Sequence, residues 1–335
     1  MRQRVTLRDV AEQAGVSRSA VSRTFTKGAS VSPATREKVL AAAQALGYRP
    51  NILASSLTTR RTKLIGLVAD NYANPVFLTV FDQFTRRIQD RGFRPLLVNL
   101  SGDLGLDASV VMLQQYSVDG VIVASSTLPT EYAAAFREAG LPVVHSFGRS
   151  ADDAKTHIVG VDNVYCGRMA AETLLDHGYR RIGFLGGPQT ATSARDRFQG
   201  FAEALSDRKI SFTHSFAGAY SYDAGRAEMD RLIAKGDVAE AYFCGDDLLS
   251  VGAIDALSAS GLTVPQDVGI IGMNDMDMAR WGCIDLTTIR QPMERIIGNS
   301  IDQVIALIEA PDAPPEIQLL PCEVVLRKTL RRTNP

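Results

Sequence analysis

The chain has few residues that could cross-link a fold or hold a metal. Of its 335 residues, four are cysteine and four are histidine. The cysteines form no CxxC pair, which argues against a disulfide scaffold and a structural zinc site. The histidines stand apart, without the spacing of metal ligands. We therefore expect no metal, no cofactor and a reducing compartment.

Long apolar runs are also missing. No stretch approaches the roughly 18 apolar residues of a membrane span, and the first residues contain no apolar signal core. Neither secretion nor membrane insertion is expected, so the predicted location is the cytoplasm. At roughly 150 residues per domain, a chain that is 45% apolar can bury more than one core.

The net charge of -1 hides an uneven distribution. The first 63 residues contain 12 lysines and arginines against 3 acidic residues, whereas the other 272 residues contain 24 against 34. A short basic segment joined to an acidic body is typical of a protein in which one part meets a polyanion. Charge alone favours nucleic acid as the partner.

The basic segment predicts three short helices. Thr6 and Asp9 form a capping box for the first helix, which ends at Gly15. Ser17 can cap a second helix from Arg18 to about Thr26. The third helix begins with Ser32 as N-cap and Pro33 at its first position, and stops at Gly47.

The second helix carries polar side chains on its outer face. Arg18, Ser19, Ser22 and Arg23 can reach base edges in the major groove, as the second helix of a helix-turn-helix does. The hydroxyls and amides at the starts of the helices suit phosphates. A solvated basic helix is the alternative, and the excess of positive charge argues against it.

Several motifs of this segment stand in the order and spacing of one family. VTLRDVA (5–11), GVS (15–17), VSR (21–23), VSPATREKV (31–39) and LGYRPN (46–51) resemble the headpiece of the LacI/GalR (lactose repressor/galactose repressor) family. The resemblance extends over essentially the whole chain. It implies a DNA-binding set of Thr6, Ser17, Arg18, Ser19, Ser22, Arg23, Thr26, Ser32, Thr35, Asn51 and Leu57.

The segment after the headpiece has two interpretations. In the family it becomes a hinge helix on DNA, and Leu57 matches the leucine that wedges into the minor groove. Seven or so residues rich in serine and threonine are too few to hold a helix in water, so DNA would have to supply the order. An ordinary interdomain linker is the alternative.

From Leu64 onward, short apolar runs alternate with helical patterns, which predicts a parallel α/β fold in two doubly wound halves with a cleft between them. The whole chain is thus of the α/β class with an all-α helix-turn-helix headpiece. The expected strands are 64–69, 95–98, 120–123, 142–144, 181–185, 241–244 and 268–271.

The body resembles the periplasmic-binding-protein-like core of the same family. The matching motifs are NPVF (74–77), DGVI (119–122), GVDN (160–163), HGY (177–179), SARDR (193–197), IGMND (271–275) and LTTI (286–289). The expected domains are a headpiece (1–48), a hinge segment (49–63) and a core (64–335), with an N-subdomain of about 64–162 and 291–321 and a C-subdomain of about 163–290 and 322–330.

Ligands of such sheets bind beyond the carboxyl ends of the strands, where this chain is polar. Arginine suits an anion or a ring hydroxyl, amides and acids suit sugar hydroxyls, and aromatics supply a stacking wall. Because Arg195 and Arg197 lie two apart on a helix, we expect Arg197 alone in the cleft. The resemblance and the strand-end positions together give an effector set of Asn71, Tyr72, Ser125, Phe147, Ser193, Arg197, Tyr220, Asp246 and Asn274.

Three of these positions depart from the family's commoner pattern. Asp246 stands where asparagine is usual, while Asn274 and Phe147 stand where aspartate is usual. A sugar, sugar acid or sugar phosphate is the expected effector class, but these exchanges leave its identity open.

Two other classes of protein share this type of fold. An enzyme is disfavoured because the chain lacks GxGxxG, a Walker P-loop, GxSxG and HExxH. A sugar-binding transport receptor would share the body but not the basic helix-turn-helix. We expect a homodimeric repressor of a pseudo-palindromic operator, controlled by a small effector of carbohydrate metabolism. The alternative is an activator or co-repressed regulator of central carbon metabolism with a non-sugar effector.

Overall fold

The computed structural model describes residues 5–26, 28–49, 61–70, 72, 74–100, 105–148 and 155–332. The chain divides into two compact units, Met1–Thr62 and Lys63–Pro335. Among the described residues, no helix is long and apolar enough to cross a membrane.

The first unit contains the three helices α1 (Leu7–Ala14), α2 (Arg18–Phe25) and α3 (Pro33–Leu46). Their termini follow the predicted caps. Thr6 and Asp9 form a capping box, Ser17 and Ser32 cap the next two helices, and Gly15 and Gly47 end α1 and α3 in the left-handed conformation. One small apolar core joins the helices: Val10, Ala11, Val21, Val39, Ala42 and Ala43.

The second unit contains two six-stranded sheets. The first runs in the order β11-β5-β4-β3-β1-β2, and all its neighbouring strands are parallel. Its strands are β1 (Leu64–Ala69), β2 (Arg94–Asn99), β3 (Gly120–Ala124), β4 (Val143–Ser146), β5 (His157–Gly160) and β11 (Ile317–Leu319).

Helices cover both faces of this sheet. Ile65 and Leu67 face α5 (Val76–Asp90) and α12 (Met293–Glu309), whereas Val68 faces α6 (Leu106–Gln115) and α7 (Thr130–Glu138). Successive side chains of a strand point to opposite faces, so a strand buried on both faces is apolar at every position. The apolar run at 64–69 has this pattern.

The second sheet runs in the order β12-β10-β9-β8-β6-β7, with β12 antiparallel to β10. The helices α8 (Asn163–Asp176) and α9 (Thr192–Asp207) cover one face, and α10 (Tyr222–Ala234) and α11 (Asp247–Ala259) cover the other. Its strands are β6 (Ile182–Gly186), β7 (Phe212–Phe216), β8 (Ala241–Cys244), β9 (Gly269–Asn274), β10 (Thr287–Arg290) and β12 (Glu323–Val325).

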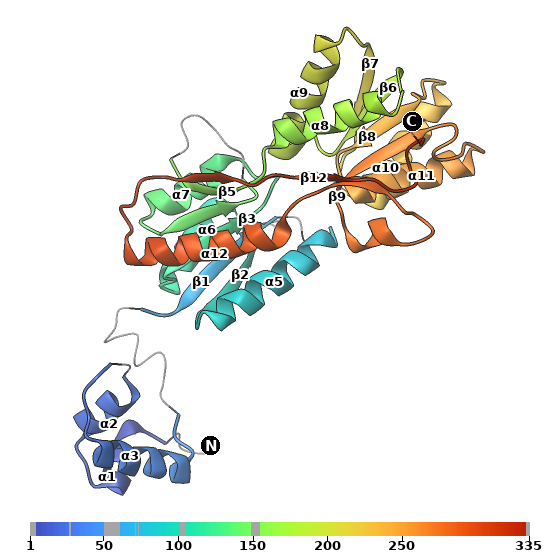
Figure 1. Ribbon diagram of the computed structural model, residues 1–335. Helices are drawn as coiled ribbons and strands as arrows, with labels where there is room; N and C mark the ends of the chain where they lie inside the picture. The colour runs from blue at the N-terminus through green and yellow to red at the C-terminus, as the bar shows by residue number, and fades with distance from the viewer. Residues whose placement is uncertain are drawn as a thin grey trace. The chain divides into compact units, whose positions relative to one another are not determined.

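The chain passes between the two sheets three times. The crossings are 161–162 after β5, 291–292 after β10, and 320–322 between β11 and β12. In Figure 1 the last crossing is the dark red segment that runs from the first sheet into the second. The three crossings connect two subdomains, one around each sheet.

The seven expected strands are all present, as β1, β2, β3, β4, β6, β8 and β9. The runs that were not assigned as strands include β5 and β7. β5 (HIVG) contains only two strongly apolar residues, and β7 (FTHSF) carries three polar residues among its five, so neither has the pattern of a buried apolar run.

Candidate functional site

The outer face of α2 presents the polar side chains that the sequence singles out. Arg18, Ser19, Ser22 and Arg23 are exposed, whereas Val21 is fully buried on the inner face. Arg18 and Arg23 make no ion pair or side-chain hydrogen bond with the described part of the chain. Their guanidinium groups are therefore available for an outside partner.

Several hydroxyls nearby are engaged in local hydrogen bonds. Ser17 Oγ accepts from the backbone amide of Ala20 and lies 2.9 Å from Ser19 Oγ, and Thr26 Oγ1 donates to the carbonyl of Ser22 at 2.9 Å. Their first role is to fix the ends of α2. Ser17 and Ser19 are exposed at the start of α2, a position that suits a phosphate.

Arg36 positions α2 against α3. Its guanidinium donates to the carbonyl of Thr24 at 3.0 Å, so a charged hydrogen bond joins the two helices at their polar boundary. Of the other expected contacts, Thr6 and Ser32 are exposed N-caps, and Thr35 is half-buried. Asn51 and Leu57 lie outside the described residues, as does most of the segment predicted as a hinge.

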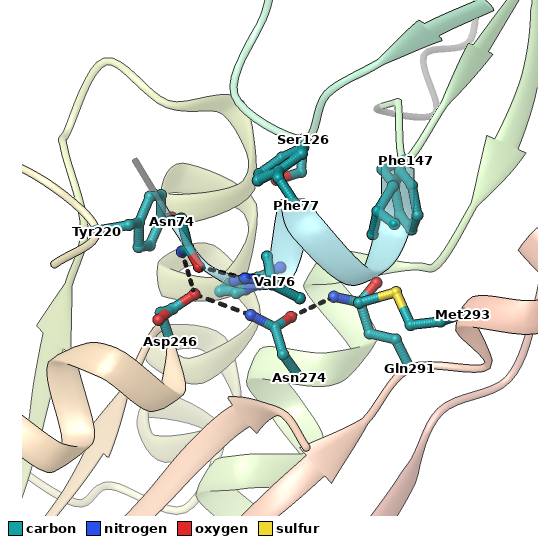
Figure 2. A pocket seen from close by; sticks show the side chains of 12 residues that line it. Asn74, Val76, Phe77, Ser126, Phe147, Tyr220, Asp246, Asn274, Gln291 and Met293 are labelled. Carbon is teal, nitrogen blue, oxygen red and sulfur yellow. Dashed lines mark hydrogen bonds between the residues drawn. The ribbon is translucent and has the colours of Figure 1, made fainter. Parts of the chain in front are cut away.

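In the second unit, a pocket lies between the subdomains at the carboxyl ends of the strands (Figure 2). Its cavity volume is only about 30 Å³, well below the roughly 300 Å³ or more of a typical small-molecule site, so the cleft is nearly closed in this structure. Its lining residues come from both subdomains and from the crossing at 291–292: Asn74, Val76, Phe77, Val80, Ser126, Phe147, Arg197, Tyr220, Asp246, Asn274, Gln291 and Met293.

A hydrogen-bonded chain of side chains forms the polar side of this pocket. Asn74 Nδ2 donates to Asp246 Oδ2 at 3.2 Å, and Asn274 Nδ2 donates to the same oxygen at 2.8 Å. Gln291 Nε2 then donates to Asn274 Oδ1 at 2.6 Å. Figure 2 shows this chain as the dashed lines. Because Asn74 precedes α5 and Asp246 precedes α11, their bond joins the two subdomains directly.

Asp246 also begins a helix. It is the N-cap of α11, and its Oδ1 accepts from the amide of Leu248 at 2.7 Å. Burial raises the pKa of this carboxyl to about 6, and the hydrogen bonds from Leu248, Asn74 and Asn274, with the charge of Arg197, oppose that rise. A buried carboxylate with only neutral direct partners favours a ligand that offers further hydrogen-bond donors.

Arg197 is held in the pocket wall and is only 3% exposed. Its Nε donates to Asn163 Oδ1 at 2.8 Å and its NH1 to the carbonyl of Gly245 at 2.6 Å. Arg195, two positions earlier on α9, is exposed. The expected division of the two arginines is therefore what the structure shows.

Two pocket residues have unusual backbone conformations. Phe147 has φ 63° and Asn274 has φ 114°, in the region that favours glycine and costs a bulky residue energy. Backbone strain of this kind gathers at binding sites because the surrounding structure enforces it. Here it turns a phenyl ring and an amide toward the same pocket (Figure 2).

Of the nine residues expected in the effector set, five line the pocket: Phe147, Arg197, Tyr220, Asp246 and Asn274. Ser193 supports the wall from behind, because its hydroxyl lies 3.2 Å from the Tyr220 hydroxyl. Asn71 lies outside the described residues.

The structure does not place the remaining two in the lining. The Ser125 hydroxyl donates to Asp70 Oδ1 at 2.8 Å and is fully buried, while its neighbour Ser126 lines the pocket. The ring of Tyr72 stacks on Phe81 with 4.7 Å between centroids, so it packs against α5.

The sequence did not reveal some lining residues. Val76 and Phe77 stand out only as part of a family motif, and nothing in the sequence points to Gln291 or Met293. The position of Gln291 on a crossing between subdomains is what brings it to the pocket. A search of the strand ends alone misses such residues.

The raised pKa of Asp246 gives a prediction for stability. An unfolded aspartate titrates near pH 4, so between about pH 4 and 6 the folded protein binds more protons than the unfolded chain. The contribution of Asp246 to the free energy of unfolding therefore increases as the pH falls through that window and decreases as the pH rises. The total change is about 3 kcal/mol at most.

Asp246→Asn should remove this dependence. The melting temperature of the variant is expected to change less than that of the wild type between pH 5 and 7.5, as followed by thermal unfolding. The pKa of the buried Asp247 is raised by burial and also by the charge of Asp246, so the difference between the two proteins contains the titration of Asp246 and its effect on Asp247. Equal pH profiles for the two proteins would contradict the assignment.

Comparisons with known proteins agree with both units. Residues 6–51 match the family model "Bacterial regulatory proteins, lacI family", and residues 171–330 match "Periplasmic binding protein-like domain". The transcriptional regulator CelR of Thermobifida fusca is 33% identical over 313 residues, covering 91% of this chain and 92% of CelR. The transcriptional repressor PurR of Mannheimia succiniciproducens is 31% identical over 332 residues, covering 98% and 99%.

Solved structures show the same architecture. The lac repressor dimer bound to operator and the anti-inducer ONPF matches with a TM-score of 0.89 at 28% identity, covering 98% of this chain and all of that one. A complex of CelR with cellobiose matches with a TM-score of 0.73 at 30% identity, covering 97% and 100%. These relatives are transcription regulators, not enzymes. The chain belongs to the LacI family of DNA-binding transcription regulators.

Proposed function

We propose that this protein is a homodimeric repressor that reads a pseudo-palindromic operator and is controlled by a small sugar-like effector. The observation that carries the DNA-reading part is the exposed outer face of α2, with two arginines that have no partner among the described residues. A two-fold symmetric protein calls for a two-fold symmetric site on DNA. Because its target is bacterial operator DNA, it acts in the cytoplasm.

In the headpiece, base reading falls to Arg18, Ser22 and Arg23, since an arginine can bond guanine O6 and N7 together. Phosphate contacts fall to the helix starts and flanking hydroxyls, which position the headpiece without reading sequence. We assign the remaining expected contacts to the hinge segment, 49–63, where Leu57 would wedge into the minor groove and Asn51 would help to place it.

Exposed apolar side chains support the homodimer. Leu78 on α5, Leu97 on the edge strand β2 and Val111 on α6 are 70%, 51% and 50% exposed. The edge strand β2 follows α5 and precedes α6 in the chain. A paired copy of the chain would bury such a surface.

We place the effector in the pocket between the subdomains. Apolar side chains form one wall, including Phe77, Phe147 and Met293, and polar ones form the other. This arrangement fits a sugar, sugar acid or sugar phosphate, whose ring has an apolar face and whose hydroxyls need donors and acceptors. A solved structure of CelR is a complex with cellobiose, which supports a carbohydrate.

The bonds across the pocket suggest how the effector acts. Asn74 bonds Asp246 across the cleft, and the carbonyl of Ser126 accepts from the Ser193 amide at 3.2 Å and from Thr192 Oγ1 at 3.1 Å. A ligand that competes for these groups changes the relative free energy of two subdomain arrangements. The effector can regulate DNA binding only if it binds one subdomain arrangement more tightly than the other.

Arg18→Ala tests the DNA-reading face. We expect specific operator affinity to fall about 10- to 100-fold, with a relaxed preference at one base position, because one base contact contributes about 1–3 kcal/mol. Lys63→Ala should instead weaken specific and random DNA alike, since a phosphate contact carries no sequence information. The operator is first selected from a random DNA library, and affinities are measured by gel shift.

The same experiment separates the alternatives. Equal losses on operator and random DNA for Arg18→Ala would remove the base-reading role. Repeating the gel shift with sugars, sugar acids and sugar phosphates gives the sign of regulation: release of the operator marks an inducer, and tighter binding marks a co-repressor. If only a non-sugar metabolite has an effect, the proposed effector class is wrong.

A further inference from the structure

Two cysteines far apart in the sequence meet in the structure. Cys166 lies in the first turn of α8, and Cys322 lies on the crossing between β11 and β12. Their sulfur atoms are 3.4 Å apart, although 156 positions separate them. A disulfide bond is about 2.05 Å long, so a closing movement of about 1.4 Å joins the two sulfurs.

The surroundings of the pair favour thiolate chemistry. The hydrogen bond between the two thiols and the positive charge of Arg197 lower the pKa of Cys166, against the effect of burial. The same hydrogen bond and partial burial raise the pKa of Cys322. Cys166 therefore ionises first, and a thiolate is the reactive form of cysteine.

The position of the pair matters for the fold. Asp162, on the first crossing, is the N-cap of α8, and Cys166 follows four positions later. Cys322 belongs to the third crossing, at 320–322. A covalent bond between the two sulfurs would therefore join the third crossing, at 320–322, to α8, the helix that follows the first crossing at 161–162.

We propose that Cys166 and Cys322 form a redox-sensitive thiol pair, which a hydroperoxide converts into a disulfide that restrains the crossings between the subdomains. The Cys166 thiolate attacks one oxygen of hydrogen peroxide, the O–O bond breaks, and hydroxide leaves, which gives a sulfenic acid. The Cys322 sulfur attacks that sulfenic sulfur, the S–O bond breaks, and water leaves with the Cys322 proton. The two thiols lose two electrons and the peroxide gains them.

The other two cysteines serve as internal controls. Cys244 is as buried as Cys166, but the pKa of its thiol is raised to about 12 by burial, whereas the pKa of Cys166 is lowered. Cys244 therefore forms far less thiolate and should resist oxidation. Cys283 is exposed and could form disulfides between molecules. The experiment therefore uses the full-length Cys283→Ser protein, which keeps three thiols.

The purified Cys283→Ser protein is treated with hydrogen peroxide, denatured, alkylated and digested without reductant. We expect loss of two of the three alkylatable thiols, a cross-linked peptide pair containing Cys166 and Cys322, and recovery of both thiols with dithiothreitol. Adding Cys322→Ser should abolish the cross-link. If Cys166 and Cys322 are still alkylated, or are oxidised separately to sulfinic acids, the pair is not a disulfide switch.

Hydrogen exchange tests the restraint. In the oxidised protein, amide exchange at 161–163 and 320–323 should slow at least about five-fold relative to the reduced protein, since opening these segments would strain the new bond. Unchanged exchange with the disulfide formed would overturn the restraint. Neither measurement uses DNA or effector, so the outcome is independent of the proposed function.

Discussion

Replacing Arg197 with alanine is expected to weaken effector binding at least about 100-fold, because truncating a buried, charge-bearing partner costs about 3 kcal/mol or more. The guanidinium lies in the pocket wall, fixed by Asn163 and the carbonyl of Gly245. The alanine variant lacks the guanidinium N–H groups that would donate to the ligand. It also leaves Asn163 Oδ1 and the Gly245 carbonyl without their donor. Arg195→Ala, on the exposed face of the same helix, should leave affinity within about two-fold.

The measurement is a thermal-shift screen of the wild type against sugars, sugar acids, polyols and their phosphates. A ligand that binds the folded state raises the melting temperature, and calorimetry of that ligand with each variant then gives the affinities. Arg197→Lys keeps the charge without the planar fork and should recover only part of the loss. An equal rise in melting temperature for wild type and Arg197→Ala would show that the ligand binds elsewhere.

The second large effect concerns the packing of α8 against α9. A Cβ on Gly200 would overlap the backbone carbonyl of Val164, and one on Gly167 would overlap that of Arg197. The two helices approach this closely only because both positions lack a side chain. Since backbone atoms cannot swing aside, Gly200→Ala should destabilise the protein by about 3 kcal/mol or more.

Gly298→Ala is a matched control within a helix. An added Cβ there meets only the guanidinium of Arg87, at 3.0 Å, which donates to the Glu294 carbonyl and would have to shift slightly. Alanine favours a helix by up to about 1 kcal/mol over glycine. Urea denaturation should show a large loss for Gly200→Ala and little change or a gain for Gly298→Ala. A midpoint for Gly200→Ala equal to that of the wild type would mean that α8 and α9 can move apart without cost.

Local chemistry made the headpiece easy to predict. The caps at Thr6, Ser17 and Ser32 and the glycines at 15 and 47 act within one helical turn, so sequence contains all the information for those boundaries. Strands buried on both faces were equally visible as apolar runs. β5 and β7 were missed because their residues alone do not show that partners bury them.

The pocket could be predicted only in part, for a different reason. Its members were found where a strand end or a family motif pointed to them, as with Arg197 and Asp246. The bond from Asn74 to Asp246 spans 172 positions and that from Gln291 to Asn274 depends on a crossing. The cysteine pair is a similar case: spacing argued against a disulfide, but the fold brings the sulfurs to 3.4 Å.

The side chain of Asp246 affects both the stability of the fold and the polar lining of the pocket. One oxygen of its carboxyl caps α11, and the other accepts from the amides of Asn74 and Asn274 in the pocket lining. A substitution selected there for a new effector therefore also alters the start of a helix and the closure of the cleft. We therefore expect a substitution of Asp246 that changes effector specificity to change the stability of the protein as well. Further substitutions elsewhere would be needed to restore that stability.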